Sequence, residues 1–230
     1  MNDFINIRPI GVIRTDFKEK FGIPRQSGRA PSALGRVVLH PEFRDPDVFR
    51  DIEGFSHLWL IFDFSQAHRE KWSPTVRPPR MGGNRRTGVF ASRSPFRPNP
   101  IGLSSVKLVR VERTKNEGDV LIVAGADLLD MTPIIDVKPY IPFSDCHTDA
   151  VGGYSDCFAD HKLNVFIPPE LAEIIPEDKS AALTECLSDD PRPSYQDDPQ
   201  RIYSMRFSDM DVHFRVEGDR AIVVGIDKMK

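Results

Sequence analysis

The feature that most limits the fold of this chain is a series of short apolar segments, separated by turns, in its first two-thirds. The segments alternate apolar and polar residues, or are apolar on both faces, and no helical repeat lies between them. They cover residues 7–14, 36–40, 57–64, 88–92, 104–112 and 119–126. Strands that follow one another without intervening helices indicate an antiparallel barrel rather than a doubly wound sheet.

The strongest predicted strand, residues 57–64 (HLWLIFDF), is apolar on both faces, which favours burial on both sides or closure into a barrel. We interpret His57, which begins this strand, as a hydrogen-bonded core histidine rather than a catalytic base. Residues 115–118 (KNEG) form a turn that joins the last two predicted strands as a hairpin.

The pattern changes after Tyr154. Apolar spacing predicts a helix within residues 169–187, and residues 203–216 and 221–226 are typical of a closing hairpin. We therefore expect a mainly β protein. Residues 1–154 would form a single antiparallel β-barrel domain, and residues 155–230 a small α+β C-terminal domain.

Several common site types are absent from the sequence. The glycine fingerprint of a dinucleotide-binding fold is missing, because Gly82, Gly83 and Gly88 lie in a loop rich in arginine and proline. No G-x-S-x-G, P-loop or H-E-x-x-H motif occurs. The residues Cys146, His147, Cys157 and His161 lack the paired spacing of zinc ligands, so we expect no metal. A nucleotide-like cofactor would have to bind in another way.

The sequence also bears on location. The chain has three widely spaced cysteines, an odd number that argues against a disulfide framework and favours a reducing compartment. No apolar run approaches the roughly 20 residues that span a bilayer, and the N-terminus lacks the pattern of a signal peptide. We expect a cytoplasmic protein without a membrane partner.

Basic residues are concentrated in one part of the chain, although the net charge is −3. The band comprises Arg69, Lys71, Arg77, Arg80, Arg85, Arg86, Arg93 and Arg97. Only Glu70 opposes it within that stretch. Such a band can neutralise nucleic-acid phosphates locally. The alternative is an arginine-rich loop that pairs with carboxylates elsewhere in the protein.

Three segments stiffened by proline carry the candidate chemistry: residues 18–26, 77–104 and 127–142. The second and third contain R-P-P-R-x-G-G-N-x-R-x-G-V-F-A-x-R-S-x-x-R-P-N-P-I-G-L-S and D-x-x-D-x-T-P-x-x-D-x-K-P-Y. These motifs, with P-R-Q at 24–26 and D-P-R-P-x-Y at 190–195, resemble the TsaA-like family over nearly the whole chain. Met131 departs from the glycine that close relatives often carry there.

The resemblance implies a β-barrel that binds S-adenosylmethionine without a Rossmann-type fold, and a homodimer. It implies methylation of N6-threonylcarbamoyladenosine on N6, at position 37 of transfer RNA, beside the anticodon. The cofactor residues implied are Pro24, Arg25, Gln26, Ser65, Gln66, Arg93, Leu103, Asp127 and Asp130.

Residue chemistry suggests further roles. Asp136 and Tyr140 are candidates to assist deprotonation of N6, and Asn99 is held between two prolines so that its amide has a fixed direction. Phosphate contacts to the anticodon loop are expected from Arg69, Lys71, Arg85, Arg86 and Arg97. Phe96 would stack on a base. Two alternatives are a non-catalytic barrel that binds RNA or a nucleotide, and a methyltransferase that acts on a small molecule.

Overall fold

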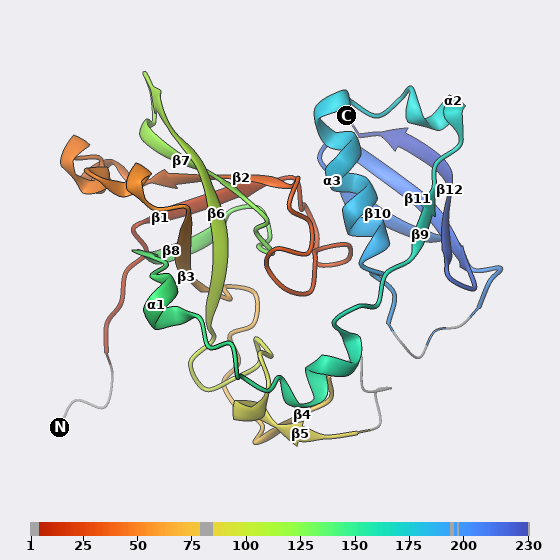
Figure 1. The fold of residues 1–230 in the computed structure, drawn as a ribbon, viewed down its shortest axis with the longest axis horizontal. Helices are drawn as coiled ribbons and strands as arrows, with labels where there is room; N and C mark the ends of the chain where they lie inside the picture. Colours follow the sequence, from red (N-terminus) through yellow and green to blue (C-terminus); the bar gives the residue numbers. More distant parts are fainter. Residues whose placement is uncertain (1–4, 79–84, 194–195, 197, 230) are drawn as a thin grey trace.

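A computed structural model describes residues 5–78, 85–193, 196 and 198–229. The barrel strands are β1 (Gly11–Thr15), β2 (Leu34–Leu39), β3 (His57–Asp63), β6 (Ile101–Thr114), β7 (Gly118–Ala124) and β8 (Thr132–Pro139). They close in the order β1-β2-β7-β6-β3-β8, with every neighbouring pair antiparallel (Figure 1). The predicted antiparallel barrel is confirmed.

Alternation along the strands fills the barrel. Leu58, Leu60 and Phe62 of β3 point inward and are buried, so the residues between them face outward. Gly102 on β6 is required by this packing, because a Cβ atom there would lie 2.2 Å from the ring of Phe62. The glycine of the motif R-P-N-P-I-G-L-S is therefore explained by packing in the barrel wall.

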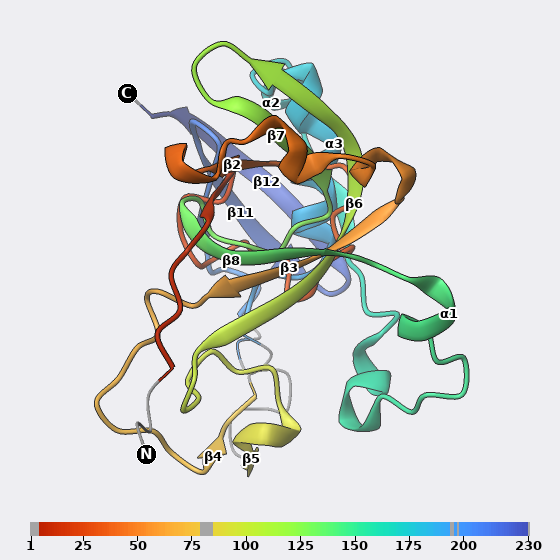
Figure 2. The same cartoon turned by 90° about the vertical axis from the view of Figure 1, so that its left-hand side faces the viewer.

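Short elements surround the barrel. Between β2 and β3 lie the 3-10 turns Pro41–Phe43, Pro46–Phe49 and Ile52–Gly54. The two-stranded sheet of β4 (Thr75–Val76) and β5 (Thr87–Gly88) lies below the barrel in both Figures 1 and 2. Helix α1 (Pro142–Asp145) follows β8, and a 3-10 turn, Gly153–Phe158, leads to the C-terminal unit.

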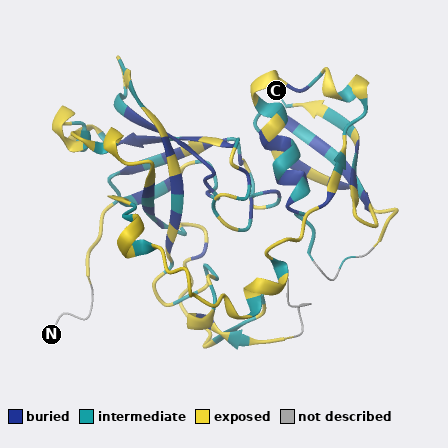
Figure 3. Ribbon diagram, viewed as in Figure 1, coloured by how far each residue is buried: buried dark blue, intermediate teal, exposed yellow. Residues whose placement is uncertain are grey.

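The C-terminal unit consists of β9 (Asn164–Phe166), α2 (Pro169–Ala172), α3 (Glu177–Ser188), β10 (Tyr203–Phe207), β11 (Met210–Glu217) and β12 (Arg220–Lys228). Its sheet has the order β10-β11-β12-β9, in which only β9 pairs in parallel. Figure 3 shows that buried residues concentrate in this unit and in the barrel strands.

The long β1–β2 loop joins the two parts. Phe17, Ala30 and Ala33 of this loop are buried in the same apolar cluster as the C-terminal sheet and α3. A segment of the barrel half thus completes the core of the C-terminal unit. The division near residue 154 stays a prediction.

The local predictions have different outcomes. The hairpin turn is confirmed, since β6 and β7 pair down to Thr114 and Gly118, and Gly118 has a positive φ of 72°. The predicted strand at 88–92 is wrong. There β5 ends at Gly88, and a 3-10 turn, Val89–Ala91, follows, in which the amide of Ser92 donates to the carbonyl of Val89 at 3.3 Å.

The predicted helix within 169–187 is divided into α2 and α3. Pro176 lies at the boundary, where it cannot donate to a continuing helix, and α3 begins at Glu177. Among the described residues, no helix is long and apolar enough to cross a membrane.

Candidate functional site

A cavity of about 480 Å³ lies on the outer wall of the barrel. The outward-facing Trp59 on β3 is opposite Ser105 on β6, and the next cross-strand pair on the same face is Ile61 and Leu103. The cavity is lined by Ser27, His57, Trp59, Arg93, Leu103, Ser105, Tyr140 and Asp145. Its volume is within the range of about 300–1,000 Å³ that is typical of small-molecule sites.

One wall of this cavity is aromatic. The rings of Trp59 and Tyr140 lie 5.4 Å apart, and the indole Nε1 of Trp59 donates to Asp145 Oδ2 at 2.9 Å. The amide of Ile141 donates to the same oxygen, and together these bonds lower the pKa of Asp145. Desolvation, with Cys146 and Asp145 nearby, raises the pKa of Tyr140. Tyr140 therefore stays a phenol at neutral pH and is suited to donate a hydrogen bond.

Arg93 contributes a guanidinium group to the cavity lining, near the half-buried carboxylate of Asp127. Arg93 Nη1 donates to Gln26 Oε1 at 2.6 Å, and Ser104 Oγ donates to Asp127 Oδ1 at 2.5 Å. The amide of Ser27 also donates to Asp127. Burial raises the pKa of Asp127, although the hydroxyl of Ser104 and the charge of Arg93 act in the opposite direction.

The structure brings four of the predicted cofactor residues together: Gln26, Arg93, Leu103 and Asp127. Two others are engaged elsewhere. Arg25 Nη2 donates to the carbonyl of Arg192 at 2.6 Å in the C-terminal unit. Asp130 accepts from the amide of Thr15 and from Lys18 Nζ, at 2.9 and 2.8 Å. Pro24, beside Arg25, is buried.

The remaining predicted residues are not part of the cavity lining. Ser65, Gln66 and Asn99 are exposed in the loops where β3 ends and β6 begins, which are joined by the bond from Phe64 N to Pro100 O at 2.8 Å. Asp136 on β8 is paired across the strands with Ile61, and its carboxylate contacts Lys138 Nζ at 3.0 Å. Two strand spacings, about 10 Å, separate it from Leu103.

Five lining residues were missed by the sequence analysis: Ser27, His57, Trp59, Ser105 and Asp145. The prediction that His57 is a core histidine is wrong. Its side chain is exposed, because His57 and Trp59 occupy the positions of β3 that alternate with the buried Leu58 and Leu60. That period of two was the signal that could have placed both residues on the outer wall.

A second surface is formed by exposed aromatic rings and arginines around β4 and β5. We call it the aromatic–arginine surface; it comprises Arg69, Trp72, Arg86, Phe90, Phe96 and Arg97. The guanidinium of Arg69 lies 3.8 Å from the ring centre of Phe96, and the rings of Trp72 and Phe90 lie 6.4 Å apart. Exposed fractions of 52% for Trp72 and 75% for Phe90 leave these rings open to a stacking partner.

The arginines of this surface make polar contacts to neutral groups of the described residues. Within the described part of the chain, no ion pair includes Arg69, Arg86 or Arg97; Arg86 Nη1 donates to Thr75 Oγ1 and Arg97 Nη1 to the carbonyl of Ser92, both at 3.1 Å. The predicted contacts Lys71 and Arg85 are exposed. Arg80, Gly82, Gly83 and Tyr195 lie outside the described residues.

The cysteines Cys146, Cys157 and Cys186 are free thiols. In the ranges that the structure describes, no three histidine, cysteine or acidic side chains gather as a metal site would require.

Comparison with known proteins identifies the family. The model of the tRNA-methyltransferase O N-terminal domain matches residues 12–146, and the model of the TrmO C-terminal domain matches residues 162–229. The chain is 42% identical over 215 residues to a tRNA (adenine(37)-N6)-methyltransferase of Escherichia coli, covering 90% of this chain and 91% of that protein. It is 40% identical to a putative S-adenosylmethionine-dependent methyltransferase, RcsF, of Pseudomonas aeruginosa, covering 91% of each.

Solved structures agree with the sequence comparison. A crystal structure of TrmO from Pseudomonas aeruginosa superimposes with a TM-score of 0.78 at 34% identity, covering 97% of this chain and 99% of that one. A mouse tRNA (adenine(37)-N6)-methyltransferase is 38% identical, but over 135 residues, 58% of this chain and 30% of that protein. Because both family models match and together span most of its length, the chain belongs to the tRNA-methyltransferase O family.

Proposed function

We propose that this protein transfers the methyl group of S-adenosylmethionine to N6 of N6-threonylcarbamoyladenosine at position 37 of transfer RNA. The observation that carries the proposal is the outer-wall cavity, where Arg93 and Leu103 of one motif segment meet Tyr140 of another. The relatives support methylation of adenine 37 on transfer RNA. The threonylcarbamoyl group is a finer inference from the resemblance of the motifs.

The residues of the cavity fit the cofactor. The guanidinium of Arg93 is suited to pair with the methionine carboxylate, and Asp127 to accept hydrogen bonds from ribose hydroxyls or an ammonium group. Leu103 and Trp59 present apolar faces for the adenine ring. When bound, S-adenosylmethionine supplies a methyl group on an electrophilic sulfonium.

Methyl transfer requires the protein mainly to position the donor and the acceptor. The bond from N6 to the methyl carbon forms as the carbon–sulfur bond breaks, and the N6 proton must leave. Alignment of two reactants can lower a barrier by about 7–11 kcal/mol, and stiff proline-rich loops on a barrel suit that task. Acylation by the threonylcarbamoyl group makes the N6 proton more acidic, so a single base suffices.

We propose Asp136 as the base and Tyr140 as a hydrogen-bond donor, because the raised pKa of Tyr140 disfavours its phenolate. Asn99 is proposed to contact the substrate from the loop that precedes β6. Replacing Asp136 with Asn should lower kcat about 100-fold, whereas Tyr140→Phe should have a smaller effect. An unchanged kcat in D136N would remove Asp136 from this role.

The aromatic–arginine surface supports the anticodon loop as partner. Bases of a single-stranded loop can be splayed out and stacked on exposed rings such as Trp72 and Phe90, and arginines contact the phosphates. Binding through several phosphates should weaken steeply between 50 and 200 mM salt. A small neutral substrate would not show this dependence.

The decisive test is a transfer assay with labelled S-adenosylmethionine. Transfer RNA from cells that make the threonylcarbamoyl group is compared with transfer RNA from cells that lack it. Label on the modified RNA alone supports the proposal, and label on both supports methylation of unmodified adenine 37. Cofactor binding without label on either RNA would favour the alternative, a non-catalytic RNA- or nucleotide-binding barrel.

We further propose a cytoplasmic homodimer. The free cysteines suit a reducing compartment, and the exposed Phe143 and Val151, at 92% and 86%, offer apolar surface to a second copy. Sedimentation velocity at micromolar concentration tests the dimer, and a monomer under all conditions would contradict it.

A further inference from the structure

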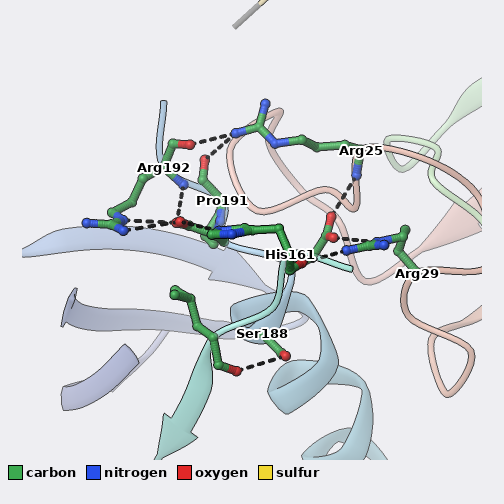
Figure 4. A network of polar contacts seen from close by, with 9 residues as sticks. Arg25, Arg29, His161, Ser188, Pro191 and Arg192 are labelled. Carbon is green, nitrogen blue, oxygen red and sulfur yellow. Dashed lines mark hydrogen bonds and ion pairs between the residues drawn. The ribbon is translucent and has the colours of Figure 1, made fainter. Parts of the chain in front are cut away.

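The loop that walls one side of the cavity is held by the C-terminal unit. Figure 4 shows Arg25 and Arg29, from the β1–β2 loop, directed toward the segment that follows α3. Residues 25–29 of this loop also include Gln26 and Ser27, which contact the cavity side chains. The same short segment therefore faces the cavity and the C-terminal unit.

The principal contact is made by Asp189, which directly follows α3. Asp189 is only 2% exposed. One oxygen accepts from Arg29 Nε at 2.6 Å, and the other accepts from the amide of Arg25 at 3.2 Å. Arg29 also donates to the carbonyls of Ala159 and His161, at 2.5 and 2.9 Å. This buried carboxylate therefore holds the loop at two points, through the backbone amide of Arg25 and through the side chain of Arg29.

Those two points lie on either side of the residues that reach the cofactor site. Gln26 accepts from Arg93 at 2.6 Å, and the amide of Ser27 donates to Asp127. Because Arg25 and Arg29 are both fixed by Asp189, the direction of the Gln26 amide and of the Ser27 N–H is fixed as well. The positions of the Arg93 and Asp127 side chains therefore depend on contacts made by the C-terminal unit.

Other contacts hold the two ends of the loop without involving this segment. Near its start, Lys179 Nζ of α3 contacts Asp16 Oδ2 at 2.7 Å. Near its end, Ser32 donates twice to Glu185, at 2.8 Å each. Docking of the loop onto the unit therefore does not depend on Asp189 alone, which separates a local positioning role from a role in general stability.

We propose that Asp189 is a positioning residue for the cofactor site: it fixes residues 25–29 so that Gln26 and Ser27 orient Arg93 and Asp127. The proposal rests on the proposed function, because it assumes that these residues hold S-adenosylmethionine. It assigns to the C-terminal unit a role in cofactor binding, although none of the described residues of that unit lines the cavity.

The test measures S-adenosylmethionine binding by calorimetry, without transfer RNA. Asp189→Asn should raise the Kd about tenfold, since it removes a charge-assisted bond to Arg29. Lys179→Met is the matched control, because it removes another contact between α3 and the same loop. It should lower the melting temperature and leave the Kd within about twofold.

A double-mutant cycle shows whether Asp189 acts through Gln26. Gln26→Ala and Asp189→Asn should be non-additive in Kd, because either change alone releases Arg93. Should Asp189→Asn fail to fold, Arg29→Lys removes the Nε donor to Asp189 from the other partner, together with the guanidinium bonds to the carbonyls of Ala159 and His161.

Each result has one consequence. A Kd within twofold of wild type in both Asp189→Asn and Arg29→Lys would overturn the inference and leave the proposed function standing. Fully additive effects with Gln26→Ala would overturn the route through Gln26. Absence of binding by the wild-type protein would overturn the proposed cofactor, and the inference with it.

Discussion

Buried and exposed residues alternate along the strands of both the barrel and the C-terminal sheet, but the two sheets use this alternation differently. In the barrel wall, the outward positions Trp59, Leu103 and Ser105 line a cavity. In the C-terminal sheet, the buried positions, such as Met205 and Val212, pack with α3 into an apolar cluster. The proposed chemistry therefore uses the barrel face that packing leaves free, whereas the C-terminal unit supplies a core and polar contacts to one loop.

The largest expected effect tests the core of the C-terminal unit. Leu183 of α3 is fully buried, so Leu183→Ala should lower the free energy of unfolding by about 2–5 kcal/mol. Denaturant unfolding measures this, and Val224→Ala, at a position 39% exposed, is the control with a change within about 0.5 kcal/mol. Well below its melting temperature, Leu183→Ala should keep most of its kcat. If Leu183→Ala lowered kcat/KM more than Arg93→Ala does, the assignment of core packing to the C-terminal unit and of chemistry to the barrel wall would be wrong.

The next effect belongs to the barrel wall. Arg93→Ala should lower kcat/KM about 100-fold, or about 2.7 kcal/mol, by removing the proposed partner of the methionine carboxylate. Its melting temperature should change little, because the residue is exposed. Arg110→Ala, at an arginine on β6 that is exposed like Arg93, is the matched control and should keep kcat/KM within about twofold of wild type. Equal losses in both variants would point to general charge rather than to the cavity.

A smaller effect tests whether RNA binds to the aromatic–arginine surface rather than to the C-terminal unit. Trp72→Ala should raise the KM for transfer RNA about tenfold, because stacking contributes about 1–3 kcal/mol per base. The Kd for S-adenosylmethionine should not change. Phe166→Ala is the control, since this aromatic residue on β9 is 48% exposed, close to the 52% of Trp72. An equal rise in KM for Phe166→Ala would show that the C-terminal unit also contacts RNA.

The smallest effect concerns pH. Because burial raises the pKa of Asp127, the ionised carboxylate destabilises the folded protein. Wild-type stability should therefore fall as pH rises from the unfolded-state pKa through the raised folded-state pKa. Asp127→Asn lacks this dependence, so it should be the more stable protein at pH 7, with the difference vanishing in acid. Thermal melting from pH 3 to pH 7 measures it, and a less stable variant at pH 7 would contradict the assignment.

Sequence patterns predicted the elements whose periodicity is clean. The alternation in residues 57–64 and the turn at 115–118 both correspond to observed elements. Strand β8 was missed because Pro133, Asp136 and Pro139 interrupt the alternation of apolar and polar residues from which a strand is predicted. It pairs with β1 and β3 and closes the barrel, so its pairing partners rather than its own composition make it a strand.

What the sequence by itself determined was the barrel class, most of its strands and the family, because alternation and long motifs are local properties of the chain. Only the tertiary structure decided which motif residues meet. Gln26 and Arg93 are far apart in sequence yet in contact, whereas Arg25 turns toward the C-terminal unit. Proline-rich loops have no period from which a side-chain direction follows, so packing against distant segments sets it.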